Sequence, residues 1–233
     1  MRDIHIIIGG PQGSGLETVM RLIARLSARL GYHFIADREY YSNIRGRHSY
    51  IHMRISVKPV KALSYPVDVL AFIDAESIFH HFRDIRKGGY LVFNTRLSDV
   101  KLDTIKSIRK YTLERLKREL KSVGVSGESV QDVIEWLKIN LKVNVIGLDY
   151  DNLIKKVSSK GIPYPQASRL VSTIVASSVI FLMGFDVNEM KECIYEVFKG
   201  RPSAIKANIL MIDEVINLSL IHISEPTRLG MIS

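Results

Sequence analysis

The sequence predicts an α/β domain with a mostly parallel sheet and flanking helices. Short apolar segments alternate along the chain with longer segments whose apolar residues recur every three or four positions, which is typical of strand–helix–strand folds. One segment, VDVLAFI (67–73), is apolar almost throughout, as is usual for a strand covered on both faces. With 233 residues, 46% of them hydrophobic, the chain is long enough for one domain with a sizeable core.

The first part of the chain predicts three strands and one helix. Residues 5–10 predict a short buried strand that ends in glycine, and residues 32–36 predict a second strand. Between them, residues 16–30 predict a helix with an apolar face made of Leu16, Val19, Met20, Ile23, Leu26 and Leu30. Residues 50–57 alternate and predict a half-buried strand, with an apolar side made of Ile51, Met53, Ile55 and Val57.

The rest of the chain continues the alternation after the strand at 67–73. The predicted elements are a helix at 75–87, a strand at 88–94, helices at 103–123 and 129–141, a strand at 143–149, and helices at 149–160, 166–183 and 187–199. The apolar run at 170–185 approaches the length of a membrane span. It contains four hydroxyl residues and follows Arg169, so we interpret it as a buried core helix and expect no membrane association.

The C-terminal residues do not fit this pattern. Residues 1–200 are expected to form the domain, and residues 201–217 to begin a linker. Residues 218–233 continue no helical pattern and resemble translated sequencing-adapter DNA, so we exclude them from the fold as a non-native tail. On this interpretation the natural protein continues beyond residue 217.

Composition favours an anionic partner. The formal net charge is +9, which suits nucleic acid, phosphorylated cofactors or acidic proteins, although excess lysine also occurs on solvated surfaces. The single cysteine, Cys193, excludes an internal disulfide and a cysteine-ligated metal cluster within this chain. The first apolar run is too short for a signal peptide, so we expect a cytoplasmic protein.

A glycine-rich turn separates the first strand from the first helix. It does not match a P-loop, because Leu16 and Glu17 stand where a lysine and a hydroxyl residue are required. The spacing G-x-x-G-x-G is also the reverse of the dinucleotide fingerprint. Such a turn can bind an anion at the helix N-terminus, or its glycines can serve close packing alone. The candidate cofactor-binding residues are Gly10, Gln12, Gly13 and Gly15.

Three segments in order carry a family resemblance: GGPQGSG (9–15), REYYSNIRGRHSYIHMRIS (38–56) and VDVLAFIDAESIFHHF (67–82). Together with the helix at 16–30 they resemble the gamma domain of the 2-oxoacid:ferredoxin oxidoreductases, in the form fused to the alpha subunit of archaeal two-subunit enzymes. The resemblance covers roughly residues 2–200. The family's loop reads like REYPSNIKGGHS, and its substituted positions here are Tyr41, Arg45 and Arg47.

The resemblance implies a Rossmann-like gamma domain and a reaction that this chain shares with other parts of an enzyme. A 2-oxoacid is decarboxylated on thiamine diphosphate, electrons pass through an iron–sulfur cluster to ferredoxin, and coenzyme A takes the acyl group. The chain has no GDG diphosphate motif and one cysteine, so we expect it to bind none of these cofactors alone and to be inactive by itself. Its expected partners are the beta subunit and the remainder of alpha, with a thiamine-type domain after residue 217.

The resemblance also implies that the polar loop at 38–50 faces coenzyme A or the 2-oxoacid. Both ligands carry anionic groups that arginine, histidine and asparagine side chains can bind. The candidates are Asn43, Arg45, Arg47 and His48. The alternative is internal tethering, in which Arg38 pairs with Glu39 or Asp37 and Asn43 caps a turn.

Two other functions remain open at this point. The chain could be the separate gamma subunit of an indolepyruvate-type enzyme, or a nucleotide- or nucleic-acid-binding module. The basic residues of the helix at 103–123 go round its circumference, which favours a solvated surface over nucleic-acid binding. Adjacent His80 and His81 diverge on their helix and are poorly placed to share a metal, and Asp149 is expected to cap a helix.

Overall fold

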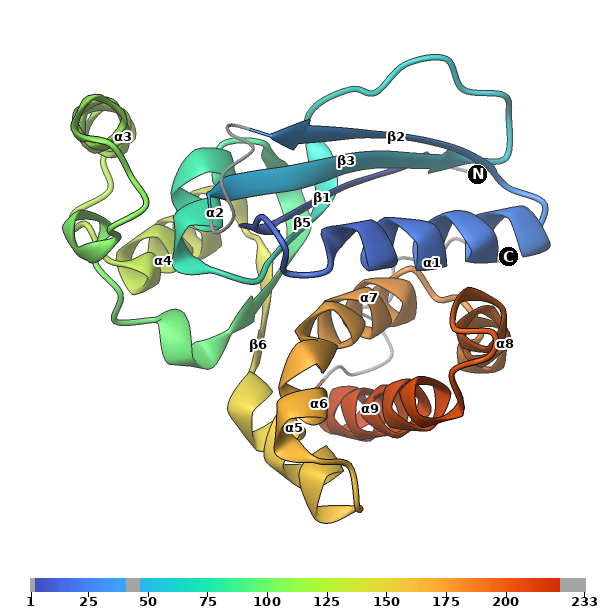
Figure 1. The fold of residues 1–233 in the computed structure, drawn as a ribbon. Coiled ribbons are helices and arrows are strands. Elements are labelled where there is room, and N and C mark those ends of the chain that lie inside the picture. The colour runs from blue at the N-terminus through green and yellow to red at the C-terminus, as the bar shows by residue number, and fades with distance from the viewer. Residues whose placement is uncertain (1–2, 41–46, 223–233) are drawn as a thin grey trace.

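The computed structural model describes residues 3–40 and 47–222 and shows a six-stranded sheet between two layers of helices (Figure 1). The strand order is β2-β3-β1-β4-β5-β6. The strands are β1 (Ile4–Pro11), β2 (His33–Tyr40), β3 (His48–Ser56), β4 (Val67–Phe72), β5 (Ile85–Asn94) and β6 (Asn144–Leu148). Neighbouring strands from β1 through β4 and β5 to β6 are parallel, and β3 lies antiparallel between β1 and β2. The predicted α/β class with a mostly parallel sheet is confirmed.

The helices cover both faces of the sheet, and each face has its own core. The helices are α1 (Leu16–Arg29), α2 (Ala75–His81), α3 (Lys110–Val123), α4 (Val130–Leu141), α5 (Tyr150–Ser159), α6 (Tyr164–Ala167), α7 (Val171–Leu182), α8 (Val187–Val197) and α9 (Pro202–His222). One layer holds α1 and α5 to α9, and the other holds α2 to α4. Because side chains alternate across a strand, Ile6 and Ile8 of β1 pack in the first core and Ile7 in the second.

Strand β3 corrects the prediction of a half-buried strand at 50–57. It is an inner strand with helices on both sides, so its polar residues are buried as well as its apolar ones. His52 is 4% exposed and Ser56 is 2% exposed, whereas Val57, expected on the apolar side, lies beyond the strand and is 40% exposed. Alternation indicated the strand correctly but could not show that a second layer covers its polar side.

Two helix boundaries also differ from the prediction. The helix expected at 75–87 ends at His81, because Ile85 begins β5 and pairs with Val67 of β4. The helix expected at 103–123 is a short 3₁₀ turn, Leu102–Thr104, followed by α3 from Lys110. At the start of the 3₁₀ turn the backbone bonds to a distant segment, since Leu102 N–H donates to the carbonyl of Glu128 at 2.8 Å. Asp149 caps α5 as expected, accepting a hydrogen bond from the Asn152 backbone.

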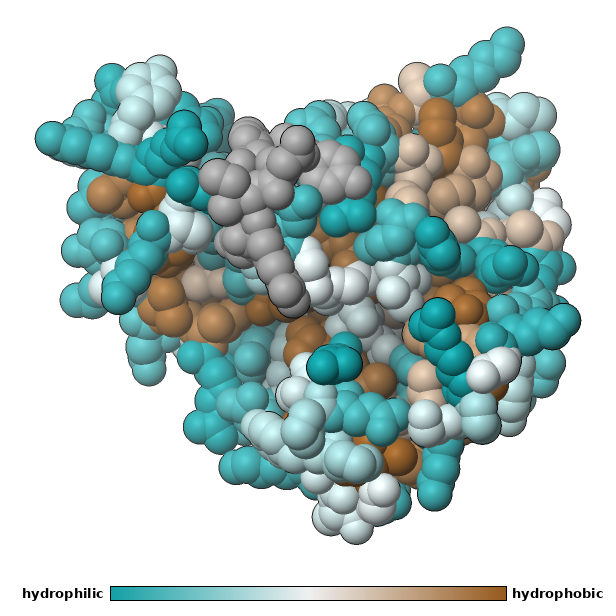
Figure 2. Space-filling model, viewed as in Figure 1, coloured by the Kyte–Doolittle hydropathy of each residue, from teal (hydrophilic) through white to brown (hydrophobic). Residues whose placement is uncertain are grey.

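The apolar run at 170–185 forms a core helix, as predicted. Every residue of α7 from Ser172 to Leu182 is buried. Within the described residues, Tyr164–Leu182 is the stretch long and apolar enough to cross a membrane, but 72% of that window is buried inside the domain. The outer surface in Figure 2 is mostly hydrophilic, with hydrophobic residues in scattered patches.

The core extends past residue 200, which corrects the expected linker at 201–217. These residues form most of α9, which contacts α5, α7 and α8. Ala207, Met211, Ile212 and Val215 of this helix are fully buried. The helix continues to His222 and so includes the first five residues of the segment expected to follow no helical pattern, and residues 223–233 lie outside the described part of the chain.

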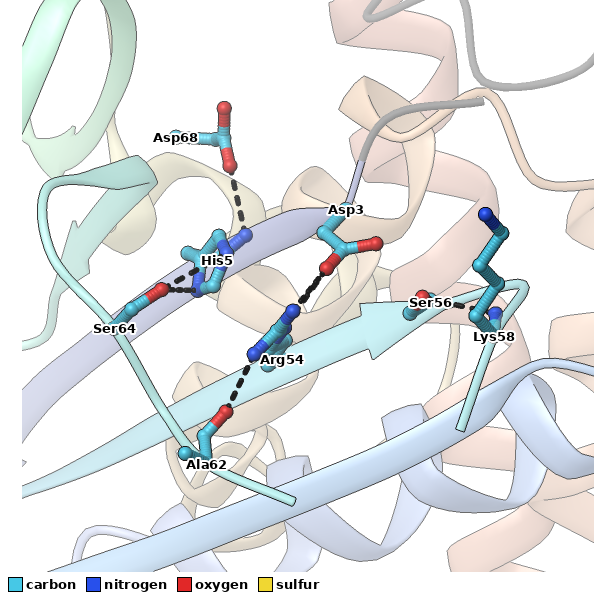
Figure 3. A network of polar contacts seen from close by, with 8 residues as sticks. All are labelled: Asp3, His5, Arg54, Ser56, Lys58, Ala62, Ser64 and Asp68. Atoms are coloured by element: carbon cyan, nitrogen blue, oxygen red, sulfur yellow. Dashed lines mark hydrogen bonds and ion pairs between the residues drawn. The ribbon is translucent and has the colours of Figure 1, made fainter. Parts of the chain in front are cut away.

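A polar network ties down the amino-terminal side of the sheet (Figure 3). The Arg54 guanidinium donates from Nε to Asp3 at 2.9 Å and from Nη1 to the Ala62 carbonyl at 2.8 Å. The His5 backbone N–H donates to the Asp68 carboxylate at 2.8 Å. These contacts fix the connection between β3 and β4 at the edge opposite the glycine-rich turn.

Candidate functional site

The glycine-rich turn joins the carboxyl end of β1 to α1. Gly13 and Gly15 have φ angles of 94° and 90°, the left-handed region that side-chain-bearing residues rarely adopt. Gly15 is the N-cap of α1 and supplies no side-chain cap. A Cβ atom on Gly15 would lie 2.8 Å from the Ser172 side chain, and one on Gly9 would lie 2.5 Å from Ser77 Oγ. Close packing therefore accounts for these glycines in part, and the turn also leaves backbone N–H groups open at the helix start.

The turn lies directly beside the start of β3. Pro11 pairs with His48 in the sheet, and the Gln12 backbone N–H donates to the Arg47 carbonyl at 2.7 Å. The described end of the polar loop and the glycine-rich turn therefore share the carboxyl edge of the sheet. The other two loop candidates, Asn43 and Arg45, lie outside the described residues.

Arg47 lies at a cavity between β3, α2 and the start of α3, which we call the histidine cavity. Its volume is about 170 Å³, and its lining includes Arg47, His48, Glu76, His80, Arg109 and Arg115. The Arg47 Nη1 group donates to the Ser107 carbonyl at 2.8 Å. That bond uses one of the five N–H groups of the guanidinium, so Arg47 can be tethered and still bind an anion.

His48 belongs to a buried group with His80 and His81, the histidine cluster. His48 Nε2 lies 3.1 Å from His81 Nε2, and His81 Nδ1 lies 2.8 Å from the Asp84 carboxylate. The His80 ring stacks on His48 with 4.5 Å between centroids. Burial, reinforced by the charges that His80 and His81 can carry, lowers the pKa of His48 to about 2. His48 is therefore neutral near pH 7, and in its contact with His81 one ring donates and the other accepts.

The histidine cluster distinguishes the two described candidates of the loop, His48 and Arg47, in their capacity to bind a ligand. His48 is 2% exposed, and its Nδ1 atom lies 3.4 Å from Ser77 Oγ, so both ring nitrogens already have protein neighbours. Internal tethering suits this histidine, whereas Arg47 keeps donors for a ligand. Sequence reasoning did not group His80 and His81 with His48, because nothing in the local spacing shows that β3 packs on α2. Arg38, expected to pair with a neighbour in the loop, forms an ion pair with Glu17 at 3.2 Å.

A second and larger cavity lies on the other side of the glycine-rich turn, and we call it the glycine-turn cavity. Its volume is about 1000 Å³, and it lies between the turn, the N-terminal half of α7 and the start of α9. Gly13, Ser14 and Gly15 form one wall of it. Gly13 and Gly15 of the turn therefore line this cavity, whereas Arg47 and His48 line the histidine cavity.

Comparison with known proteins agrees with this fold. Residues 5–218 match the family described as Pyruvate ferredoxin/flavodoxin oxidoreductase. The alpha subunit of 2-oxoacid:ferredoxin oxidoreductase 1 from Aeropyrum pernix is 37% identical over 212 residues, which is 89% of this chain and 33% of that subunit. The alpha subunit of the Saccharolobus solfataricus enzyme is 34% identical over 197 residues, 84% of this chain and 31% of the subunit. The chain thus spans about a third of the curated relatives it matches.

Solved structures show the same fold at low sequence identity. The 2-oxoglutarate:ferredoxin oxidoreductase from Magnetococcus marinus, with 2-oxoglutarate, coenzyme A and succinyl-CoA bound, matches 97% of this chain and 32% of its own at a TM-score of 0.68 and 17% identity. The gamma subunit of a keto/oxoacid ferredoxin oxidoreductase from Geobacter sulfurreducens matches 93% of this chain and 98% of its own at a TM-score of 0.60 and 14% identity. The sequence match over residues 5–218 shows that the chain belongs to the pyruvate ferredoxin/flavodoxin oxidoreductase family.

Proposed function

We infer that this chain is the gamma-type domain of a cytoplasmic 2-oxoacid:ferredoxin oxidoreductase alpha subunit. The complete enzyme would decarboxylate a 2-oxoacid, reduce ferredoxin and transfer the acyl group to coenzyme A. The observation that carries this proposal is the match of most of the chain to about a third of the length of 2-oxoacid:ferredoxin oxidoreductase alpha subunits. A stand-alone gamma subunit is less well supported, because the curated relatives are alpha subunits about three times as long as the matched region.

The domain would supply binding rather than chemistry. An iron–sulfur cluster does not fit it, because the whole sequence has one cysteine, and Cys193 is buried in α8. The chain also has no GDG motif for thiamine diphosphate. Both cofactors would be held by the beta subunit and by the part of alpha that the relatives have beyond the matched region.

The proposed contribution of the domain is the carboxyl edge of its sheet. There the Gln12–Arg47 hydrogen bond holds the glycine-rich turn against the end of the loop. Arg47, Arg109 and Arg115 surround the histidine cavity and outnumber its one acidic residue, Glu76. Such an arrangement favours a carboxylate or phosphate group. We propose that this edge borders the place where the 2-oxoacid and coenzyme A meet.

The test is steady-state kinetics of Arg47→Ala and Arg45→Ala in the assembled enzyme, with each substrate varied separately. Loss of a charge-assisted hydrogen bond worth roughly 1.5–3 kcal/mol should lower kcat/KM for the affected substrate about ten- to a hundredfold. Arg21→Ala is the matched control, because Arg21 lies on α1 and forms an exposed ion pair with Glu17. If both variants have the kinetic constants of the control for both substrates, the assignment of this edge is wrong.

A further inference from the structure

Five polar side chains form a continuous row of contacts along α2, which we call the Asp74–Asp84 row. Asp74 Oδ1 accepts a hydrogen bond from the Ser77 hydroxyl at 2.6 Å, and Ser77 Oγ lies 3.4 Å from His48 Nδ1. His48 Nε2 lies 3.1 Å from His81 Nε2, and His81 Nδ1 lies 2.8 Å from the Asp84 carboxylate. Each imidazole ring therefore contacts one neighbour through each of its two nitrogens.

The middle of the row is buried, and both ends are partly exposed. Ser77, His48 and His81 are buried, whereas Asp74 is half-buried and the Asp84 side chain is 31% exposed. Polar groups are costly in a protein interior unless they are hydrogen-bonded to one another. The row is thus a line of hydrogen-bonding groups through the interior, with a carboxyl group near the surface at each end.

The two carboxyl groups lie at opposite ends of β4. Asp74 follows the carboxyl end of this strand, and the Asp84 carbonyl accepts a hydrogen bond at 2.7 Å from the N–H of Val67, the first residue of the strand. At the Asp74 end, Gly9 of β1 leaves space for the row, because a Cβ atom there would lie 2.5 Å from Ser77 Oγ. The row therefore connects the carboxyl edge of the sheet with the other end of the strand.

The contacts of the row are complete only when one of its carboxyl groups is protonated. A neutral imidazole ring has one N–H donor and one acceptor nitrogen, and a hydroxyl group has one proton. The two rings and Ser77 therefore supply protons for three of the four contacts, and Asp74 or Asp84 must supply the last. With the proton on Asp74 every donor points towards Asp84, and with the proton on Asp84 every donor points towards Asp74. One concerted shift interconverts the two arrangements and leaves no charge on the rings.

Electrostatics in the interior favours neutral rings. Burial lowers the pKa of His48 to about 2, and burial lowers the pKa of His81 although its bond to Asp84 opposes this. Burial raises the pKa of Asp74, so this carboxyl group takes up a proton more readily than an exposed aspartate. Other titratable or charged side chains around the row and the adjoining histidine cavity include Glu39 of β2, Tyr50 of β3, Glu76 and His80 of α2, and Arg47 and Arg109.

We propose that the Asp74–Asp84 row is a proton relay, which moves a proton from the carboxyl edge of the sheet to water at Asp84. Its use rests on the proposed function. In that reaction the bond between the carboxylate and carbonyl carbons of the 2-oxoacid breaks, carbon dioxide leaves and ferredoxin takes the electrons. The S–H bond of coenzyme A is replaced by an S–C bond, so a proton remains at the carboxyl edge for each acyl group formed.

The transfer passes each proton to the next group in the row. Asp74 takes up the proton at the carboxyl edge and protonates Ser77 Oγ, while Ser77 protonates His48 Nδ1. His48 Nε2 then gives its proton to His81 Nε2, and His81 Nδ1 gives its proton to Asp84, which releases it to water. Both rings now carry the opposite tautomer, and a turn of each ring and of the hydroxyl restores the starting arrangement. The contact between Ser77 Oγ and His48 Nδ1 is the longest of the row, so removal of this hydroxyl should interrupt the transfer.

The experiment measures acyl-coenzyme A formation by the assembled enzyme in H₂O and in D₂O. The variants are Asp84→Asn and Ser77→Ala, and the control is Asp99→Asn, in an exposed turn after β5. Asparagine keeps the shape of aspartate and can still accept a hydrogen bond from His81, but it cannot carry a proton. Thermal melts of all variants establish that they fold.

The relay predicts that both variants lower kcat about ten- to a hundredfold and leave KM within about twofold of the unmodified enzyme. They should also increase the solvent isotope effect on kcat, and added formate or imidazole should restore part of the rate by carrying the proton instead. Asp99→Asn should behave as the unmodified enzyme does. If Asp84→Asn has the kcat of the control, the relay is wrong. A lower kcat with an unchanged isotope effect and no restoration by formate or imidazole would show that the row is structural, which also overturns the relay.

A second measurement does not depend on the enzyme assignment. Nitrogen-15 NMR of histidine-labelled protein reports which ring nitrogens carry a proton. In the relay His48 and His81 hold opposite tautomers and exchange them together, so the Nε2 signals of both rings should be averaged, and Ser77→Ala should separate them into two fixed signals. Two fixed signals in the unmodified protein would mean static hydrogen bonds and would overturn the relay. Averaged signals in a protein whose assembled form oxidises no 2-oxoacid would support the relay and reject the proposed function.

Discussion

The buried histidine cluster should make the stability of this domain fall in mild acid. His48 is 2% exposed, and burial next to His80 and His81 lowers its pKa to about 2, whereas an unfolded histidine titrates near 6.5. Below that pH the unfolded chain therefore binds a proton that the folded chain does not. The free energy of unfolding then decreases as pH falls from about 6.5, by about 1.4 kcal/mol per pH unit for each such histidine.

The magnitude follows from the titration of one group. Between pH 7 and pH 5, protonation stabilises an unfolded histidine with a pKa near 6.5 by about 2 kcal/mol. It does not stabilise the folded state at His48, so the free energy of unfolding falls by the same amount. Burial also lowers the pKa of His81, although Asp84 opposes it, and burial lowers that of His52, so the full effect is larger. Besides Asp84, the carboxyl groups facing the cluster include Glu76, which lies 3.4 Å from His80 Nε2, and Asp74, whose pKa is raised by burial.

The assay is urea unfolding between pH 5 and pH 8 of the unmodified protein, His48→Gln and His33→Gln. Glutamine keeps a polar side chain at position 48 but cannot take up the proton. His48→Gln should be less stable at pH 8 and should lose about 2 kcal/mol less than the unmodified protein between pH 7 and pH 5. His33 is exposed at the start of β2, so its variant should follow the unmodified protein. If His48→Gln shows the same loss as the unmodified protein, the reasoning from burial is refuted.

The other predictions concern packing. Gly15→Ala should lower the free energy of unfolding by about 1–3 kcal/mol, which is more than the effect of Gly31→Ala. Both glycines have positive φ, but only at position 15 would the added Cβ atom clash with a side chain, that of Ser172. Denaturant titration of the two variants measures the difference. Burial raises the pKa of the Cys193 thiol to about 11, so a thiol reagent at pH 8 should react slowly with the folded protein and quickly in urea; fast reaction in the folded state would contradict the packing of α8. Met211→Ala should cost about 2–5 kcal/mol in a thermal or urea melt, whereas a cost under 0.5 kcal/mol would mean that α9 is not part of the core.

Periodicity predicted the element types well because each apolar face here is long and regular. The strands at 5–10 and 67–73 and the buried helix after Arg169 were predicted from residues that indeed lie in the two cores. The predicted helix boundary was wrong at Ile85, because this residue belongs to β5 through its pairing with Val67 of β4 and not through its sequence neighbours. Local spacing cannot contain that information.

The candidate site was predictable only in part for the same reason. The glycine-rich turn and Arg47 were found from residue type, and the structure shows that they lie side by side through the pairing of β1 with β3. The residues of the histidine cluster come from β3 and α2, and residues of α1, α7 and α9 line the glycine-turn cavity. Arg201 was placed in a linker by the sequence analysis, and only the packing of α9 brings it to the cavity.

The register between β1 and β3 has a consequence for protein engineering. Eight consecutive residue pairs join these strands, from Ile4–Ile55 to Pro11–His48, and both faces of β3 are covered. An inserted or deleted residue inside β3 would break this register, so that the buried side chains on one side of the change would face the opposite core. Strand β2 ends at Tyr40, which pairs with Ser49, and β3 begins at His48. Loop sequences from relatives should therefore be grafted between Tyr40 and His48, with the paired residues of both strands left unchanged.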